Sequence, residues 1–398
     1  MLARVAPLPP VPVRAVAAMG CVLAEPITSA EDVPPFDNTA MDGYAVRAED
    51  TAGASDEQPV ELPVVAEVAA GHPAPRALEA GEAMRIFTGA PMPDGADAVV
   101  IVEHTTRLSA GQRVALRAEV SSGEAVRRAG SDLQVGDAVF APGEVISAGH
   151  LGVLAGLGRH EVQVHPRLRV GVLSTGDELV EPGRPLGPGQ IRDSNRVTLL
   201  ALVAQEGWQA VDLGLIRDDE AAISEAITAA AASCDAVVTS GGVSMGDIDL
   251  VKVVLDRIGD MRWMQIAIRP AKPFAFGLVG ERPTPVFGLP GNPVSSMVSF
   301  ELLARPALRS LAGHTELLRP EVPAIAAEPF VRHADGKVHY VRVRAERDAA
   351  GVLHVRSSGG QGSHHLTAMA RAHGLIALPD GDGVATGDPV RVLLLGER

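Results

Sequence analysis

The middle of the chain, from residue 168 to residue 311, alternates short apolar runs with longer helical patterns. The apolar runs predict buried strands at 168–174, 209–214, 236–240, 263–268 and 285–288. Helices are expected from Asp193 or Ser194 to about residue 205, at 218–232, and from residue 293 to about 311. Strands that alternate with helices predict a parallel sheet with right-handed crossovers.

The regions on either side of this alternation have β-type patterns. Short runs close to Gly, Pro or Asp predict a mostly β module, with strands at 60–65, 98–102, 113–116 and 138–140. A short helix is expected at 150–158, and the apolar stretch 11–24 is compatible with a helix or a packed strand. After about residue 320, a small all-β unit is predicted from runs at 338–343, 353–356, 375–378 and 390–395.

Composition narrows the class of protein. The 398 residues suggest roughly two to four domains, and 46% hydrophobic residues supply enough apolar material for packed cores. The formal net charge of −14 argues against a protein that mainly binds nucleic acid, which needs stripes of Lys and Arg. Two cysteines exclude a disulfide framework and a four-cysteine zinc site. No apolar stretch reaches membrane-spanning length, so we expect a cytoplasmic protein without membrane contact.

Three loops rich in glycine and hydroxyl side chains follow predicted strands, at the sheet edge where open α/β sheets bind ligands. In chain order they contain Ser174, Thr175, Gly176 and Asp177, then Ser240, Gly241, Gly242, Ser244, Gly246 and Asp247, then Pro290, Gly291, Asn292 and Pro293. Any one of them is compatible with an ordinary strand-to-helix turn. Three at one edge indicate a phosphorylated or oxyanionic ligand, and the third has residues suited to start a helix whose N–H groups attract anions.

Carboxylates and cations are expected at the same edge. The carboxylates near strand ends or helix starts are Glu178, Asp218, Asp247 and Asp249. Together these carboxylates favour a Mg²⁺ ion bound next to a phosphate group. For Asp218 and Asp247, helix capping is the alternative role. Lys252 and the segment 269–273 add positive charge, and prolines restrict the backbone around Lys272. No spacing indicates a Ser-His-Asp triad, a histidine metal site or a Walker A loop.

Taken in order, several segments resemble the MoeA family of molybdopterin molybdenumtransferases, to which the E domain of gephyrin is related. Residues 34–45, PPFDNTAMDGYA, are similar to the family's N-terminal signature, and 85–91 with 95–100 resemble a second. Further matches are STGDEL at 174–179, TSGGVSMGD at 239–247, LPGNPVS at 289–295 and QGS at 361–363. The resemblance runs from about residue 11 to the end of the sequence.

The resemblance implies an α/β plus β fold in four parts. These are a linker domain (1–45 and 143–166), a β-rich insert domain (46–142), a central parallel α/β domain that binds molybdopterin (167–315), and a C-terminal β-barrel domain (316–398). The α/β domain is similar to molybdopterin adenylyltransferases of the MoaB/Mog type. The family is homodimeric, and its active site combines the α/β domain of one subunit with the N-terminal signatures of the other.

The implied reaction belongs to molybdenum cofactor biosynthesis: molybdate is inserted into adenylylated molybdopterin, and AMP is released with the help of Mg²⁺. By resemblance, the catalytic residues are Glu178, Asp218, Asp249 and Lys272, with Asp42 and Thr88 from the other subunit and Asp132 nearby. The three loops would bind the molybdopterin substrate. Glu178, Asp218 and Asp249 would hold Mg²⁺. Molybdate would contact Arg269, Lys272, Pro273, Ser295, Arg342 and Ser363.

The chain departs from the family pattern at four positions. Ala271 stands where the family has glycine, and alanine costs about 1 kcal/mol if the backbone there is left-handed. Arg269 and Gln265 replace lysines, and Ser131 replaces a glutamate.

Two other functions stay open. One is a molybdopterin adenylyltransferase, against which the N-terminal signatures and the barrel argue. The other is a non-catalytic cofactor-binding or scaffold paralogue, which the altered turn around Ala271 favours. The expected partners are a second copy of the chain, the molybdopterin adenylyltransferase and recipient molybdoenzymes.

Overall fold

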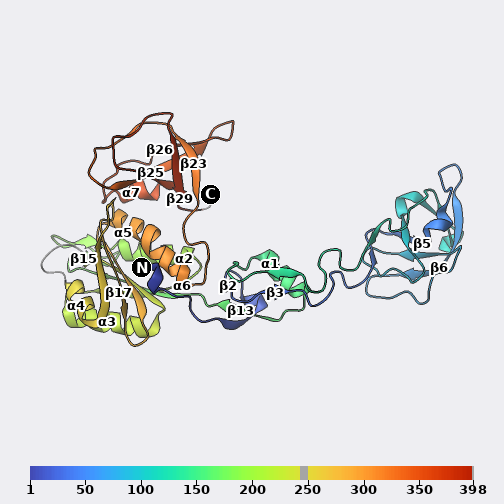
Figure 1. The fold of residues 1–398 in the computed structure, drawn as a ribbon, viewed down its shortest axis with the longest axis horizontal. Helices are drawn as coiled ribbons and strands as arrows, with labels where there is room; N and C mark the ends of the chain where they lie inside the picture. Colours follow the sequence, from blue (N-terminus) through green and yellow to red (C-terminus); the bar gives the residue numbers. More distant parts are fainter. Residues whose placement is uncertain (243–249, 397–398) are drawn as a thin grey trace.

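The computed structural model describes residues 1–242 and 250–396. Figure 1 shows an α/β part with a barrel beside it, a narrow middle part, and a β-rich part at the far end. The chain begins at the α/β part, where the amide of Leu8 donates to the carbonyl of Leu311 at 2.9 Å. It runs out to the far end and then returns. Within the described ranges, no helix is both long and apolar enough to cross a bilayer.

The narrow middle part combines the outgoing and the returning chain. Its elements are the 3-10 turn η2 (Ala15–Ala17), the sheet β1 (Val11–Arg14), β13 (Glu161–His165) and β2 (Val22–Leu23), the pair β3 (Ile27–Thr28) and β12 (Ala138–Phe140), and helix α1 (Ala148–Gly156). The 3-10 turn η1 (Leu2–Arg4) comes before them and lies at the α/β part. The helix expected near 150–158 is confirmed by α1. The stretch 11–24 forms strands instead of a helix, because Pro12 and the left-handed Gly20 oppose one and β13 offers an antiparallel partner.

The far end is a β-rich part with its own cores. A sheet has the order β8 (Ala98–Ile101), β5 (Gly43–Val46), β7 (Ala83–Ile86), β6 (Val60–Val68), β10 (Arg113–Leu116) and β9 (Thr105–Leu108). Beside it lie the pair β4 (Asn38–Thr39) and β11 (Val126–Arg127) and the 3-10 turns η3 (Ala48–Thr51), η4 (Val102–His104) and η5 (Ser109–Gly111). Tyr44, Leu116 and Val100 are buried in one core, and Met84 and Ile86 in another.

The α/β part is built on one six-stranded sheet. Its order is β17 (Gln209–Ile216), β14 (Arg169–Thr175), β18 (Ala236–Ser240), β22 (Thr284–Leu289), β21 (Pro273–Val279) and β19 (Gly259–Gln265). The helices are α2 (Asn195–Gln205), α3 (Glu220–Ser233), α4 (Leu250–Ile258), α5 (Pro293–Ser299) and α6 (Arg305–Leu311), with the π-helical turn η6 (Phe300–Ala304) joining the last two. A small pair, β15 (Leu179–Val180) and β16 (Ile191–Arg192), lies beside them.

This sheet confirms the alternation predicted from the sequence and corrects its outer edge. Strands β17, β14, β18 and β22 are parallel to one another. Strand β21 is antiparallel to both of its neighbours, β22 and β19. The sequence analysis predicted no strand at β21. The hairpin is stabilised because Phe274 and Phe276 join the core that also contains Phe287. Helices therefore cover both faces of a mixed sheet instead of a wholly parallel one.

The C-terminal part is a closed barrel of five strands. Its strands are β25 (Val338–Arg347), β26 (Leu353–Ser357), β23 (Glu321–Ala326), β29 (Pro389–Leu394) and β27 (Gly374–Leu378), which pairs back to β25. The pair β24 (Phe330–Val331) and β28 (Gly383–Val384) and the short helix α7 (Leu366–Ala370) complete it. Strand β20 (Ile268–Arg269) comes from the α/β part and adds to β25 in parallel, so the barrel and the α/β part share a strand pair.

Candidate functional site

The glycine-rich loops meet at the carboxyl edge of the α/β sheet. Since β14, β18 and β22 are parallel, their last residues lie side by side. Gly241, with a φ of +93°, approaches the first loop so closely that a Cβ on it would lie 2.8 Å from the carbonyl oxygen of Thr175. A Cβ on Gly291 would lie 3.9 Å from Gly241. The structure thus brings the described parts of all three loops together, while Ser244, Gly246, Asp247 and Asp249 lie outside the described residues.

An asparagine that the sequence analysis did not select ties two of these loops together. The Asn195 side chain, at the start of α2, donates to Ser240 Oγ at 2.8 Å and to the Gly291 carbonyl at 2.7 Å. The helix start before it was predicted, but its two partners are 45 and 96 residues away along the chain. No local pattern could reveal them.

A buried charge network supports the first loop from beneath. Ser174 donates its hydroxyl to Asp193 at 3.1 Å, and the side chain of Asp193 is almost wholly buried. Arg196 donates to Asp193, to Asp212 at 2.5 Å and to Glu181 at 2.5 Å. Because one guanidinium satisfies three carboxylates from different segments, it fixes the first loop relative to α2 and β17.

The described carboxylates of the predicted metal site, Glu178 and Asp218, are exposed and both contact the first loop. The amide of Asp218 donates to Asp177 Oδ1 at 3.3 Å. The Glu178 side chain folds over Gly176, where a Cβ would lie 2.6 Å from its Oε2. Helix α3 is capped by Asp219, which accepts from the Ala222 amide at 2.9 Å, so Asp218 is not the cap. Among the residues that the structure describes, no group of three His, Cys, Asp or Glu has metal-ligand geometry.

The positively charged turn lies at this same edge. Gln265 at the end of β19 pairs with Pro273 at the start of β21, and Ala275 pairs with Gly288 near the end of β22. The turn between β19 and β21 therefore points toward the loops. Arg269 and Lys272 are exposed on it, and within residues 1–242 and 250–396 neither side chain has a hydrogen bond or an ion pair.

The barrel contributes a buried arginine close to the third loop. Arg342 is fully buried, and its Nη2 donates to the carbonyls of Gly360 at 2.8 Å and Gly362 at 3.2 Å. Its Nε and Nη1 have no hydrogen-bond partner among the residues that the structure describes, and burial lowers the pKa of the guanidinium. The carbonyl of Ser363 accepts from the Val294 amide at 3.0 Å, which joins this barrel loop to the start of α5 beside the buried Ser295.

Asp42 and Thr88 form a pair at the opposite end of the molecule. The amide and hydroxyl of Thr88 donate to Asp42 Oδ1 at 2.8 and 2.7 Å, and these two hydrogen bonds lower the pKa of the carboxyl group. Both residues flank strands of the β-rich part, which Figure 1 places far from the α/β sheet. Within one chain they therefore do not join Glu178, Asp218 or Lys272.

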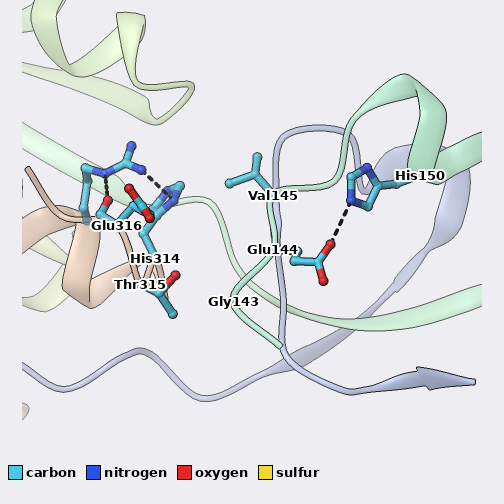
Figure 2. Close-up of a pocket in the computed structure, with 8 residues that line it drawn as sticks. Gly143, Glu144, Val145, His150, His314, Thr315 and Glu316 are labelled. Carbon is cyan, nitrogen blue, oxygen red and sulfur yellow. Dashed lines mark hydrogen bonds and ion pairs between the residues drawn. The ribbon is translucent and has the colours of Figure 1, made fainter. Parts of the chain in front are cut away.

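Two cavities are lined by other residues, and the second borders the charged turn through Ile266 and Ile268. One, of about 310 Å³, opens between the middle part and the α/β part and is lined by Glu144, His150, Arg309 and His314 among others (Figure 2). Beside it Gly143 touches Thr315 closely, since a Cβ on Gly143 would lie 2.6 Å from Thr315 Cγ2. A second, mainly apolar cavity of about 560 Å³ lies between the α/β part and the barrel.

Comparison with known proteins first defines the class. Residues 171–310 match the probable molybdopterin binding domain, so the α/β part belongs to a class of molybdopterin-binding proteins. Residues 1–158 match the MoeA N-terminal region (domain I and II), and residues 324–395 match the MoeA C-terminal region (domain IV). The chain is a member of the MoeA family.

Relatives and solved structures agree over nearly the whole length. A protein named molybdopterin molybdenumtransferase 2 from Mycobacterium tuberculosis is 40% identical over 96% of this chain and 94% of its own. The molybdopterin molybdenumtransferase of Haemophilus influenzae is 39% identical over 93% and 90%. The crystal structure of the MoeA protein from Pyrococcus horikoshii OT3 is similar with a TM-score of 0.81 at 29% identity, covering 99% of this chain and 97% of that one.

Proposed function

We propose that this protein is a molybdopterin molybdenumtransferase, which inserts molybdenum from molybdate into adenylylated molybdopterin and releases AMP. Membership of the MoeA family supports this activity, as do relatives of that name at about 40% identity. The observation that carries the proposal is the buried Arg342, whose two unpartnered nitrogens call for an acceptor that the described chain does not supply.

The proposed molybdate site combines the barrel with the charged turn. Burying unpaired guanidinium N–H groups is costly, and a tetrahedral dianion offers acceptors for them. The Ser363 loop is hydrogen-bonded to α5, which brings the barrel side of the site to Ser295. Arg269 and Lys272, without partners of their own in the described chain, add charge from the other side, beside Pro273.

The proposed molybdopterin site is the edge formed by the three glycine-rich loops. The close approach of Gly241 to Thr175 and of Gly291 to Gly241 gathers the three loops at one edge of the sheet, where a phosphate group would bind. Asn195 holds two of the loops in register, so the substrate meets a preformed site. Catalysis would consist mainly of positioning two polyanions and neutralising their charge.

Mg²⁺ is proposed as the assisting ion. Glu178 and Asp218 supply only oxygen donors, which suits a hard cation that usually binds one or two carboxylates together with substrate phosphates. The approach of Glu178 to Gly176 and the contact of Asp218 with Asp177 support this proposal, since the first loop is the proposed phosphate-binding loop. Bound there, the ion would neutralise phosphate charge. Asp249, the third proposed ligand, lies outside the described residues.

The proposal extends to the assembly. The four parts, with the bounds given from the sequence, would act in a homodimer in which Asp42 and Thr88 of one subunit reach the α/β edge of the other. Their hydrogen-bonded pair and its distance from the chain's own edge support this arrangement. We expect the enzyme to work in the cytoplasm beside the adenylyltransferase and recipient molybdoenzymes.

A reconstitution assay tests the proposed function. Purified protein is incubated with adenylylated molybdopterin, Mg²⁺ and molybdate, and AMP release is followed together with activation of an apo-molybdoenzyme. We expect both signals, and we expect Glu178→Ala to abolish them without changing the melting temperature. Adenylylation of molybdopterin by ATP, with no activation of the apo-enzyme, would instead support an adenylyltransferase. Binding without turnover would support a scaffold.

A further inference from the structure

We propose that a charge network in the barrel, built on Arg332 and Asp335, positions the molybdate turn of the α/β part. The inference rests on the proposed function and assigns to these residues a positioning role, since neither would touch the substrate.

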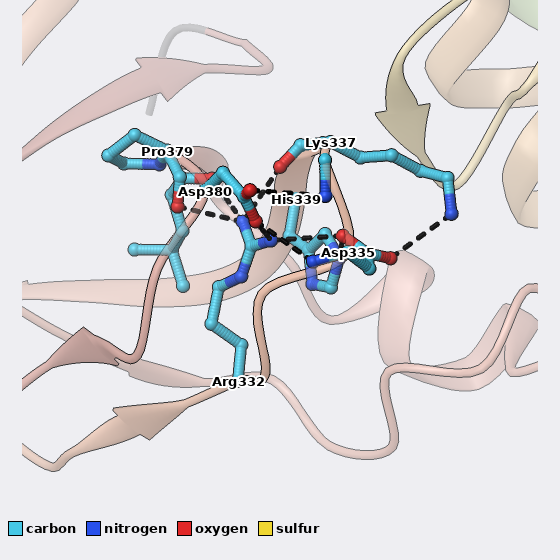
Figure 3. Close-up of polar contacts among 8 residues, drawn as sticks. Arg332, Asp335, Lys337, His339, Pro379 and Asp380 are labelled. Atoms are coloured by element: carbon cyan, nitrogen blue, oxygen red, sulfur yellow. Dashed lines mark hydrogen bonds and ion pairs between the residues drawn. The ribbon is translucent and has the colours of Figure 1, made fainter.

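The network fixes the segment that leads into β25. Arg332 is buried, and its Nη1 donates to the carbonyls of Lys337, Leu378 and Pro379 at 2.9, 2.9 and 2.7 Å. Its Nη2 donates to Asp335 at 3.0 Å and to Asp380 at 2.7 Å. Figure 3 shows the guanidinium pointing between these two carboxylates. Five hydrogen bonds from one buried cation leave the segment little freedom.

Asp335 connects this network to the start of β25. It accepts from His339 Nε2 at 3.1 Å and from Lys337 Nζ at 3.1 Å, as Figure 3 also shows. Burial would raise the pKa of Asp335, but the hydrogen bonds from His339 and Lys337 hold it at about 2. The carboxylate therefore stays charged at neutral pH and can accept from both donors.

The start of β25 in turn holds the α/β turn. The Val338 amide donates to the Ala267 carbonyl at 2.9 Å, and β20 pairs in register so that Arg269 lies opposite His339. Register partners on neighbouring strands point to the same face of a sheet. The start of β25 therefore holds the backbone of the α/β turn at Ala267 and Arg269.

The turn needs this support because its own conformation is strained. Ala271 has a φ of +79°, which L-residues other than glycine adopt at a cost. A strained segment keeps its geometry only where its surroundings determine it. The barrel supplies one of those anchors two residues before Ala271.

Equilibrium dialysis with molybdate, measured by elemental analysis, tests the inference without relying on turnover. We expect Asp335→Asn to weaken molybdate binding by roughly 3- to 30-fold while binding of adenylylated molybdopterin changes little. Asp348→Asn is the matched control. Asp348 accepts from His354 at 2.9 Å at the other end of β25 and holds its own loop, but lies away from β20. We expect this variant to bind molybdate as the wild type does.

A second pair of variants covers the case in which Asp335→Asn does not fold. His339→Leu removes a donor to Asp335 and should weaken molybdate binding, while His339→Gln keeps an N–H donor and should restore most of it. Wild-type affinity in Asp335→Asn and His339→Leu would overturn the inference, as would an equal loss in Asp348→Asn. A wild-type protein that binds no molybdate would overturn the proposed molybdate site itself, and this inference with it.

Discussion

At the scale of single residues, Ala271 stands where the sequence resemblance leads us to expect glycine, and its backbone conformation gives that difference a physical effect. The sequence analysis expected a cost of about 1 kcal/mol if this backbone is left-handed. Its φ of +79° meets that condition, and its methyl group is buried in a cluster with Val294, Met369 and Leu375. The backbone cost is therefore offset in part by apolar burial.

Ala271→Gly should consequently change stability little and in the stabilising direction. The relief of backbone strain, about 1 kcal/mol, exceeds the loss from removing one methyl group, about 0.8 kcal/mol at most. Molybdate affinity should stay equal or improve. Thermal unfolding and dialysis against molybdate measure both, and a clear loss of stability would show that the methyl group matters more than the strain.

Lys272→Gln should raise the molybdate concentration needed for turnover by about 10- to 150-fold, the value of one charge-assisted hydrogen bond. Binding of the adenylylated pterin should change less, because that substrate has many other contacts. Titration of AMP release with molybdate checks this. An unchanged dependence would remove the turn from the molybdate site.

At the scale of elements, the helix from α5 through η6 to α6 joins the proposed site to the junction with the middle part. Its C-terminal half, α6, takes part in a buried network of ion pairs. Glu206, the residue that follows α2, accepts from Arg305 at 2.6 Å, from Arg309 at 3.0 Å and from Arg319 at 3.1 Å. Burial would raise the pKa of Glu206, but these arginines lower it. The network makes the C-terminal end of the helix a firm attachment point.

His314 makes this attachment sensitive to acid. Its ring accepts from Arg309 at 3.1 Å, and burial, followed by the charge of Arg309, lowers its pKa from 6.5 to about 4. The folded state therefore prefers the neutral ring, and stability is lost as the pH falls from about 6.5 toward about 4. Between pH 7 and pH 5 the loss should be about 1 kcal/mol, allowing for solvent screening of a half-buried ring.

His314→Asn tests this directly, because asparagine keeps an acceptor for Arg309 but does not titrate. Urea denaturation at both pH values should show a smaller acid-induced loss in the variant than in the wild type. Equal losses would place the acid sensitivity elsewhere.

At the scale of the whole molecule, the proposed dimer predicts that two inactive variants recover activity when their subunits form mixed dimers. Asp42→Ala and Glu178→Ala are each expected to be inactive. A mixed dimer contains one site with neither substitution, so random mixing of equal amounts should restore about a quarter of the wild-type activity. Activity after subunit exchange, with light scattering as a check on mass, measures this. No recovery in confirmed mixed dimers would place Asp42 outside the partner's site.

The sequence predicted the sheet edge well because strand-and-loop patterns are local. The glycine-rich loops, the start of α2 and the position of Lys272 follow from runs of neighbouring residues. Asn195, Asp193 and Arg332 could not be predicted, since their roles depend on partners brought together only by the tertiary fold. Strand β21 was missed for the same reason: its antiparallel pairing depends on β19 and β22.

Gly143 and Thr315 are in close contact at the junction between the middle part and the α/β part, beside the cavity in Figure 2. On the other side of the junction, Gly313 lies so near His165 that a Cβ would come within 2.1 Å of its ring. The β-rich arm extends far from this junction, and displacement at its tip grows with distance for any given rotation. In the proposed dimer, a small tilt at the junction would move Asp42 and Thr88 away from the α/β edge of the other subunit. A side chain introduced at Gly143 or Gly313 would meet these neighbours, and we expect it to redirect the β-rich arm and to lower turnover without altering any proposed substrate contact.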